Sequence, residues 1–269
     1  MSSLKIGFIG LGDMGLPMAT RLLNHQWSVT SCANKNRDAI NVLLELGISE
    51  VETPAEVGAV SDIVITMVRD TSQTAQVIYG PDGVLAGMRK GAVLIIMSTL
   101  SPEDCRNIAS KAAEQGILVL DSPVSGLPQR AVLGTLALLV GGDAETLKQC
   151  REVLEVMGKV FHCGGVGAGT VAKLANNVVL MGTMKLLLEA RAFASAYSMS
   201  PDTLMEIFAN SSANSFTVQN WDALEANWDH YDALLIKDVG LCLEAAKIRE
   251  VVMPLTDTAI NYRPDQTSK

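Results

Sequence analysis

The fold of this chain follows from one stretch near its start, Lys5-Ile6-Gly7-Phe8-Ile9-Gly10-Leu11-Gly12-Asp13-Met14-Gly15. An apolar run predicts a strand, the G-x-G-x-x-G spacing predicts a tight turn, and the alanine- and leucine-rich residues that follow predict a helix. Gly10 permits the turn, Gly12 lets a diphosphate approach the backbone, and Gly15 lets the helix pack on the strand. The free N–H groups at a helix start favour an anion. The stretch is therefore predicted to bind a dinucleotide through Gly10, Leu11, Gly12, Asp13, Met14 and Gly15.

The composition limits the classes of protein to which the chain can belong. Its 269 residues are 48% hydrophobic and 19% charged, as in a packed protein with room for two domains. The formal net charge of −8 disfavours a nucleic-acid partner, which needs a basic patch. Uninterrupted apolar runs fall short of the roughly 20 residues of a membrane span, so no membrane partner is expected. The five cysteines lack metal-ligand spacing, which predicts no metal site and reduced thiols in the cytoplasm or an organelle matrix.

Strand-like and helical stretches alternate in the N-terminal part of the chain. The predicted strands are Lys5–Ile9, Ser28–Cys32, Ile63–Met67, Ala92–Met97, Leu118–Asp121 and Leu136–Val140. The predicted helices between them are Pro17–Asn24, Arg37–Leu46, Thr74–Tyr79, Pro102–Gln115 and Glu145–Met157. This alternation predicts parallel βαβ units in a doubly wound Rossmann sheet.

A glycine-rich stretch, 164–169, interrupts this pattern, and the residues after it are helical, beginning with one long apolar helix over Thr170–Tyr197. The sequence therefore predicts an α/β fold class, in which a Rossmann domain is followed by an all-α domain. The dinucleotide-binding domain is expected over 1–164, and a helical substrate and dimerisation domain over 165–269.

A loop of small residues, Asp121-Ser122-Pro123-Val124-Ser125-Gly126, follows one of the predicted strands. Ligands bind at the carboxyl ends of parallel strands in such sheets, and uncrowded backbone N–H groups make an anion nest. The loop is therefore a candidate binding site for an anionic substrate. An ordinary proline-serine-glycine turn is the alternative.

Two charged features occur in the helical part of the chain. Lys173 and Asn177 are four residues apart and therefore share a helix face. Burying an ammonium in an apolar helix is costly, so Lys173 is either functional or extends to solvent from the helix end. The pair Lys237-Asp238 also lies in an apolar helical stretch, where it is either part of a site or a structural ion pair.

Together these motifs resemble those of the β-hydroxyacid dehydrogenase family, and the resemblance runs from residue 4 to about residue 258. It implies that Ser125, Gly126 and the adjoining Leu127 bind the substrate carboxylate. Leu127 departs from the family, where a second glycine is common, and this difference bears on substrate identity. The resemblance also implies that Lys173 is the catalytic residue and that Asn177 holds Lys173 or the substrate. When hydride reaches a carbonyl, negative charge develops on the oxygen, and a nearby ammonium stabilises it and supplies the proton.

The same resemblance assigns further positions. Lys237 and Asp238 are expected to reach the cofactor and the substrate, respectively. Three residues that follow predicted strands are expected to contact the cofactor: Met67, Val68 and Thr99.

The residues after the second predicted strand favour NADP as the cofactor. An NAD-binding fold usually carries an acid here, about 20 residues after the glycines, to bind the ribose. The stretch Ser31-Cys32-Ala33-Asn34-Lys35-Asn36-Arg37 has no acid and has two cations that suit a 2′-phosphate. The predicted contacts are Asn34, Lys35 and Arg37. NAD is the alternative, because the Asn-Arg pair of NADP-using relatives falls on Ala33 and Asn34 in an ungapped register.

The chain is therefore expected to be an oxidoreductase that passes hydride between a nicotinamide cofactor and a small 3-hydroxy acid or the matching aldehyde-acid. One alternative is an imine reductase, a class that shares the fold but generally lacks the lysine. Another is a non-catalytic scaffold that keeps the cofactor fold. The resemblance implies a homodimer or homotetramer, and a helical domain shorter than is typical, since family members continue well beyond the position of Pro254.

Overall fold

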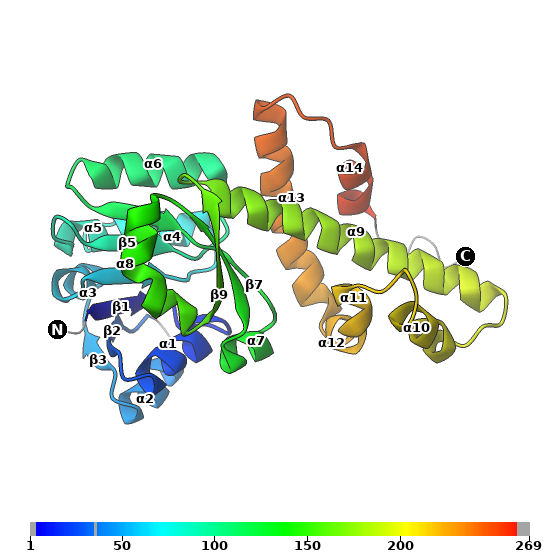
Figure 1. Ribbon diagram of the computed structural model, residues 1–269, viewed down its shortest axis with the longest axis horizontal. Coiled ribbons are helices and arrows are strands. Elements are labelled where there is room, and N and C mark those ends of the chain that lie inside the picture. Colours follow the sequence, from blue (N-terminus) through cyan, green and yellow to red (C-terminus); the bar gives the residue numbers. More distant parts are fainter. Residues whose placement is uncertain (1–3, 35–36, 263–269) are drawn as a thin grey trace. The chain divides into compact units, whose positions relative to one another are not determined.

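The computed structural model describes residues 4–34 and 37–262, which form two compact units (Figure 1). The first unit ends at Lys173 and the second begins at Leu174. This division falls inside α9 (Ala168–Ala196), shortly after the glycine-rich stretch at which the domain boundary is predicted.

The first unit contains a parallel sheet in the strand order β3-β2-β1-β4-β5-β6. Its strands are β1 (Lys5–Ile9), β2 (Ser28–Cys32), β3 (Ser49–Val51), β4 (Ile63–Thr66), β5 (Val93–Ile96) and β6 (Leu118–Asp121). The order reverses between β1 and β4, as in the dinucleotide-binding folds, so the predicted Rossmann sheet is confirmed.

Helices cover both faces of this sheet (Figure 1). They are α1 (Gly15–Asn24), α2 (Asp38–Glu45), α3 (Pro54–Val60), α4 (Thr71–Tyr79), α5 (Val84–Gly87), α6 (Pro102–Ala113), α7 (Pro128–Leu133) and α8 (Ala144–Glu155). Alternate residues of each strand enter two separate cores. In β4, for example, Ile65 packs with residues of α1, α2 and α8, and Val64 packs with residues of α3 to α6. Burial on both faces explains why the central strands β4 and β5 are almost continuous apolar runs.

The far side of the sheet differs from the prediction in strand direction. The strands β7 (Val124–Ser125) and β6 both run antiparallel to β8 (Leu136–Gly141), and β9 (Gly158–Gly164) is parallel to β8. The apolar run at 136–140 was predicted to be one more parallel strand. It is antiparallel to β6 because the chain turns back through β7 and the short α7 instead of crossing the sheet on a long helix.

Polar side chains fix the starts of several helices in the first unit. Thr53 and Glu56 form a capping box at α3, and the side chains of Ser101 and Asp143 accept backbone N–H groups of α6 and α8. Each such cap stabilises a helix by about 1 kcal/mol. These caps explain why helices begin at Pro54, Pro102 and Ala144.

The second unit is entirely helical within the described residues. After α9 it contains α10 (Pro201–Ala209), α11 (Phe216–Gln219), α12 (Trp221–Ala226), α13 (Trp228–Ile248) and α14 (Pro254–Asn261). A buried ion pair between Lys185 of α9 and Asp232 of α13 joins the two long helices. Lys185 Nζ also lies 5.0 Å from the ring centre of Trp228, which adds a cation–π contact. The predicted all-α part is therefore confirmed.

The helix α9 agrees closely with the long apolar helix predicted over Thr170–Tyr197. Its most apolar window has a mean hydropathy of 1.3, enough by length and composition to cross a membrane. A single such helix is weak support for a membrane span, because the central helix of a soluble protein passes the same test.

Candidate dinucleotide and substrate site

The carboxyl ends of four adjacent parallel strands lie in one row of the sheet. Four residues in register form this row: Ile9 of β1, Thr66 of β4, Ile96 of β5 and Asp121 of β6. The loops that leave this edge carry the glycine turn, Met67 and Val68, Thr99, and the small-residue loop after Asp121. The predicted cofactor and substrate residues of the first unit therefore share the sheet edge at which such folds bind ligands.

Contacts within the protein explain why two positions of the turn must be glycine, but they do not explain the third. Gly10 has a φ of +99°, and a Cβ on it would overlap the carbonyl of Met67. A Cβ on Gly15 would overlap the carbonyl oxygen of Gly10. A Cβ on Gly12, in contrast, would meet no protein atom within 4 Å. The protein itself does not require a glycine at this position, whereas close approach of a diphosphate does.

The start of α1 is suited to an anion. Among the described residues, no side chain caps its N–H groups, and the first turn carries no acid. Gly12 and Asp13 of the turn are exposed, and Leu11 and Met14 beside them are partly exposed. Uncapped N–H groups at the positive end of a helix dipole stabilise a phosphate. The residues of the turn therefore fit the diphosphate of a dinucleotide.

Ser98 braces the loop that follows β4. Its hydroxyl donates to the carbonyl oxygen of Val68 at 2.8 Å and accepts the backbone N–H of Val68 at 3.0 Å. These two bonds join the loops that contain Met67, Val68 and Thr99, the predicted cofactor contacts. This role was not predicted, because a single serine beside Thr99 forms no recognisable sequence pattern.

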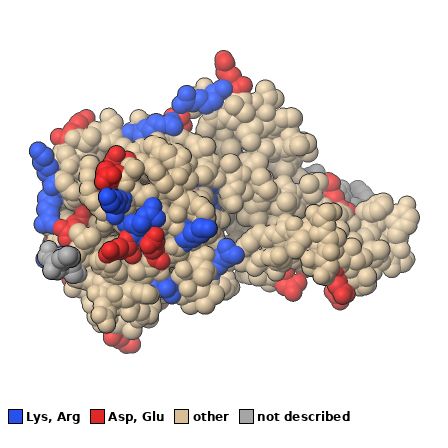
Figure 2. Space-filling model, in the orientation of Figure 1, with Lys and Arg blue, Asp and Glu red and all other residues tan. Residues whose placement is uncertain are grey.

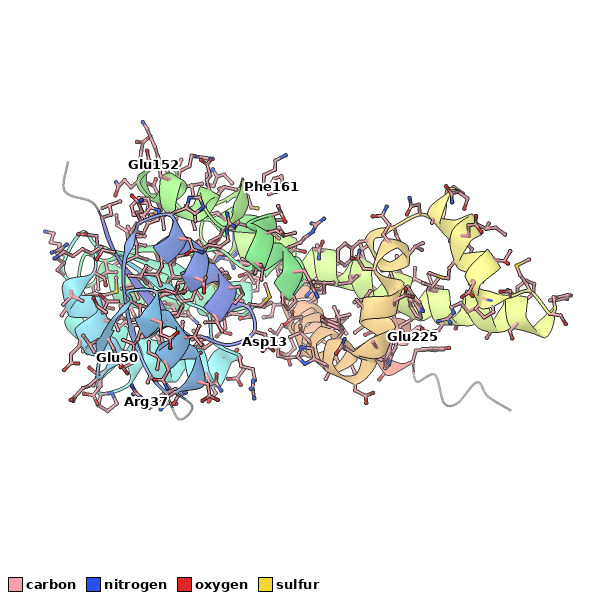
Figure 3. The ribbon with its side chains drawn as sticks, turned by 90° about the horizontal axis from the view of Figure 1, so that it is seen from below. Asp13, Arg37, Glu50, Glu152, Phe161 and Glu225 are labelled. Atoms are coloured by element: carbon pink, nitrogen blue, oxygen red, sulfur yellow. The ribbon has the colours of Figure 1, made fainter. Side chains whose placement is uncertain are left out.

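An unexpected carboxylate, that of Glu50, lies among the residues predicted to meet the adenosine ribose. Arg37 forms a forked ion pair with Glu50 of β3, in which Nη1 and Nη2 lie 2.9 Å from Oε1 and Oε2 (Figure 3). The hydrogen bond to Glu50 raises the pKa of Arg37. Register places Glu50 beside Ser31 of β2, so the acid comes from the neighbouring strand. Asn34 is exposed after β2, and Lys35 lies outside the described residues.

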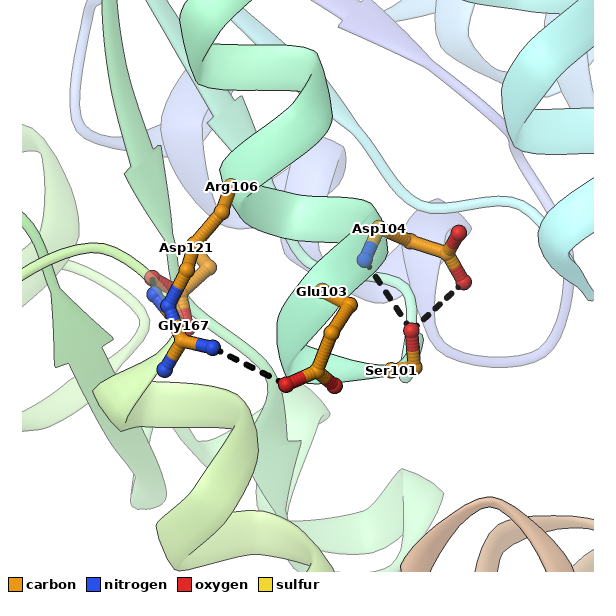
Figure 4. A network of polar contacts seen from close by, with 6 residues as sticks. All are labelled: Ser101, Glu103, Asp104, Arg106, Asp121 and Gly167. Atoms are coloured by element: carbon orange, nitrogen blue, oxygen red, sulfur yellow. Dashed lines mark hydrogen bonds and ion pairs between the residues drawn. The ribbon is translucent and has the colours of Figure 1, made fainter. Parts of the chain in front are cut away.

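Asp121 joins the small-residue loop to the start of α9. Its carboxylate is fully buried and accepts the backbone N–H group of Gly167 at 2.6 Å; Figure 4 labels both residues. It also accepts the backbone N–H group of Thr170 at 2.7 Å. Burial raises the pKa of Asp121, while these hydrogen bonds act in the opposite direction. Asp121 opens the motif singled out in the sequence, but its contact with α9 was not predicted.

The rest of the loop forms a short strand and the start of a helix. Ser125 belongs to β7 and pairs with Ala137 of β8. Gly126 has a φ of +143°, and the partly buried Leu127 precedes α7. The loop is therefore held by the sheet on one side and by α7 on the other.

Three predicted residues meet inside the second unit. Asn177 of α9 is buried, and its Nδ2 donates to Oδ2 of Asp238 at 2.8 Å. The other oxygen of Asp238 lies 3.0 Å from Nζ of Lys237. Asp238 is also buried, whereas Lys237 is partly exposed. The cluster therefore links α9 to α13 and presents an ammonium beside an amide and a carboxylate.

Lys173 is the last residue of the first unit and lies in the second turn of α9. It is partly buried, and it shares a helix face with Asn177, four residues further on. Lys173 thus lies on the helix whose start Asp121 caps, and on the same face as a member of the Asp238 cluster.

Among the described residues, no group of three His, Cys, Asp or Glu side chains has the arrangement of metal ligands. On the face drawn in Figure 2, Lys and Arg side chains are interspersed with Asp and Glu side chains over the first unit.

Family models match almost the whole chain. Residues 5–167 match the model described as "NAD binding domain of 6-phosphogluconate dehydrogenase". Residues 167–262 match the model described as "NAD-binding of NADP-dependent 3-hydroxyisobutyrate dehydrogenase". The two matches meet at Gly167, the glycine that donates to Asp121.

Known proteins resemble the chain over nearly its full length. The 2-(hydroxymethyl)glutarate dehydrogenase of Eubacterium barkeri is 36% identical, over 96% of this chain and 87% of the relative. The structure of Mycobacterium tuberculosis 3-hydroxyisobutyrate dehydrogenase with L-serine is 31% identical, with a TM-score of 0.84 over 96% of this chain and 91% of that one. An imine reductase of Streptomyces aurantiacus, 22% identical over 96% of this chain and 92% of its own, has a TM-score of 0.68 and shares the fold alone.

The fold and these matches define an NAD(P)-dependent oxidoreductase. More particularly, the chain belongs to the β-hydroxyacid dehydrogenase family. The predicted family, the enzyme class and a nicotinamide cofactor are thereby confirmed.

Gly12→Ala is expected to leave the free energy of unfolding near that of the wild type and to weaken NADPH binding about tenfold, roughly 1.4 kcal/mol. The added methyl group meets no protein atom but occupies the space of the diphosphate. Denaturant unfolding and a fluorescence titration with NADPH measure the two effects. In the control, Gly15→Ala, the methyl group overlaps the Gly10 carbonyl, so a loss of about 1–3 kcal/mol of stability is expected. Wild-type NADPH affinity in Gly12→Ala would contradict this account of the turn.

Proposed function

We propose that the protein interconverts a small 3-hydroxy acid and the matching aldehyde-acid, with Lys173 as the proton donor and acceptor. The observation that carries this proposal is the placement of a lysine on α9 one turn after the buried cap that Asp121 makes from the small-residue loop. The proposed substrate loop and the proposed acid–base residue are thereby parts of one hydrogen-bonded assembly.

Each group in this assembly has a chemical role that suits the reaction. The bound nicotinamide supplies a hydride in reduction and accepts one in oxidation. Backbone N–H groups and the Ser125 hydroxyl hold the substrate carboxylate, and so fix its carbonyl carbon. The Lys173 ammonium stabilises negative charge on the carbonyl oxygen and donates a proton to it; in the reverse direction the amine takes the hydroxyl proton. Asn177, Lys237 and Asp238 are proposed to complete the polar lining from α9 and α13.

The substrate is proposed to be a 3-hydroxy acid whose primary alcohol lies on the carbon next to the one that bears the carboxylate. The compounds named for two similar proteins, 2-(hydroxymethyl)glutarate and 3-hydroxyisobutyrate, both have this arrangement, and so does L-serine. They differ in the third substituent of the central carbon. In this chain, Leu127 follows the carboxylate loop and precedes α7, so we propose that it contacts this substituent.

The reaction assigned to Lys173 predicts a specific kinetic loss. Lys173→Ala is expected to lower kcat for NADPH-dependent reduction of aldehyde-acids about 10²–10⁴-fold and to leave the dissociation constant of NADPH unchanged. The assay uses methylmalonate semialdehyde, tartronate semialdehyde, succinic semialdehyde and glyoxylate. Lys148→Ala, which removes an exposed lysine of α8, is the matched control and should retain full activity. NADPH binding without turnover of any of these compounds by the wild type would favour the scaffold alternative.

An imine reductase is the competing enzymatic interpretation. Lys173 counts against it, because imine reductases generally carry another residue at that position. The same assay with a cyclic imine separates the two functions, since turnover of the imine that survives Lys173→Ala would support the alternative.

We propose NADP as the preferred cofactor, with Asn34, Lys35 and Arg37 near its 2′-phosphate. The five residues that follow β2, 33–37, contain no acid, which favours the phosphate over a bare ribose. Glu50 opposes this preference, because it engages both guanidinium nitrogens of Arg37. We infer that Glu50 moderates the preference for NADP by competing with the phosphate for Arg37.

This competition predicts opposite shifts in two variants. Arg37→Gln is expected to weaken NADPH binding about tenfold and to leave NADH binding unchanged. Glu50→Gln releases Arg37 and is expected to strengthen NADPH binding several-fold relative to NADH. Dissociation constants of both cofactors, measured by fluorescence at low and high salt, give the comparison. Equal changes in the dissociation constants of NADPH and NADH in Arg37→Gln would show that Arg37 does not bind the 2′-phosphate.

We also propose that the chain forms a homodimer or homotetramer. Val179, Leu186 and Phe193 lie seven residues apart on α9, and each is about two-thirds exposed in the single chain. Apolar stripes of this kind mark contact surfaces. The second unit also shows few charges on the face drawn in Figure 2. Light scattering of the purified chain distinguishes an oligomer from a monomer.

The cysteines support a reducing compartment, either the cytoplasm or an organelle matrix, because all five are free thiols.

A further inference from the structure

We propose that Asp121 is a positioning residue, whose buried carboxylate sets the place of Lys173 relative to the substrate loop. This inference rests on the proposed role of Lys173. It adds a residue that touches neither substrate nor cofactor and acts through the helix that it caps.

The contacts tie two distant parts of the sequence together. Asp121 ends β6, and its Oδ1 and Oδ2 accept the N–H groups of Gly167 and Thr170 at 2.6 and 2.7 Å. Gly167 immediately precedes α9, and Thr170 is the third residue of that helix. These N–H groups have no partner within a helix, so the carboxylate supplies an acceptor that the helix lacks. The acceptor is charged, which makes both bonds stronger than bonds to a neutral cap and favours the positive end of the helix.

Close packing leaves the first turn of α9 little freedom to move. A Cβ on Gly169 would overlap the carbonyl oxygen of Leu139, and it would lie 2.8 Å from the carbonyl oxygen of Asp121. The helix start therefore rests directly on the ends of β6 and β8. The Thr170 hydroxyl lies 3.4 Å from the buried thiol of Cys105, which fixes this turn against α6.

A partly exposed ion pair of α6, between Arg106 and Glu103, lies beside the start of α9. A Cβ on Gly167 would lie 3.4 Å from Nε and Nη2 of Arg106, so that guanidinium stands beside the glycine. Arg106 is held in turn by Glu103, at 3.1 Å (Figure 4). The Arg106 guanidinium therefore lies beside one of the two residues whose N–H groups Asp121 accepts.

Through these contacts, the position of Lys173 depends on the position of the loop that begins at Asp121. Lys173 follows Thr170 by three residues, about 4.5 Å along the helix axis. The residues that immediately follow Asp121 form the loop proposed to hold the substrate carboxylate. One buried side chain therefore fixes both the start of the substrate loop and the first turn of the helix that carries the acid–base residue. Because misplacement of a reacting group by about 1 Å can lower a rate about a hundredfold, such a link matters for turnover.

The test compares Asp121→Asn with Asp143→Asn. Asp143 caps α8 through the backbone N–H of Thr146 at 2.9 Å, and it lies outside the proposed site. Asparagine keeps one carbonyl oxygen but replaces the other with an amide group, which cannot accept the second N–H. In Asp121→Asn we expect kcat for aldehyde-acid reduction to fall at least tenfold, with the NADPH dissociation constant unchanged and KM changed less than kcat. In Asp143→Asn we expect unchanged kcat and little loss of stability, because this cap is exposed and asparagine caps a helix about as well as aspartate.

A second measurement does not depend on turnover. Amide hydrogen exchange is expected to quicken in the peptide that spans 166–173 in Asp121→Asn, and to keep the wild-type rate there in Asp143→Asn. Slow exchange of 166–173 in Asp121→Asn, equal to that of the wild type, would overturn the proposal. A loss of kcat in Asp121→Asn no larger than the loss in Asp143→Asn would also overturn it. If the wild type turns over nothing, the proposed function fails, and the exchange result still decides whether Asp121 holds the start of α9.

Discussion

The site depends on one geometric constraint, the in-register alignment of β1, β4, β5 and β6 at their carboxyl ends. Parallel pairing places Ile9, Thr66, Ile96 and Asp121 in a single row, and every loop of the proposed cofactor and substrate site in the first unit leaves from or near this row. A shift of one residue in any pair would turn the apolar side chains of that strand to the wrong face of the sheet. The two buried cores, one on each face, therefore hold the site in place.

Two helices begin beside this row, and their N-terminal N–H groups are treated differently: those of α1 are uncapped, and those of α9 are capped by Asp121. The glycine turn after β1 keeps side chains away, and it leaves an uncapped helix start for a diphosphate. After β6, the Asp121 carboxylate closes the start of α9, so that helix is not available to an anion. One edge thus contains an open helix start and a closed one. The open start suits cofactor binding, and the closed start suits a helix that must carry Lys173 at a fixed place.

The sequence predicted those features that depend on local pattern. The bounds of β1, β2 and β6 match the predicted strands residue for residue. The apolar residues of β1 and β6 and the β-branched residues of β2 are typical of strands. The strand β3 was missed because Ser49-Glu50-Val51 is too short and polar to stand out, and the direction of β8 was wrong because an apolar run does not reveal direction. The pairing of Arg37 with Glu50, the brace that Ser98 forms and the cap that Asp121 forms link loops or strands that are distant in sequence, so they follow only from the folded sheet.

The central claim is that the row of strand ends assembles a site for hydride transfer to a small aldehyde-acid. The most direct measurement follows the hydrogen itself: NADPH carrying two deuterium atoms at C4 of the nicotinamide is mixed with methylmalonate semialdehyde and the enzyme, and the product is analysed by mass spectrometry and NMR. The account predicts 3-hydroxyisobutyrate with one deuterium on the carbinol carbon. A reduced product that carries no deuterium at this carbon, or bound NADPH with no reduction of any aldehyde-acid tested, would contradict it.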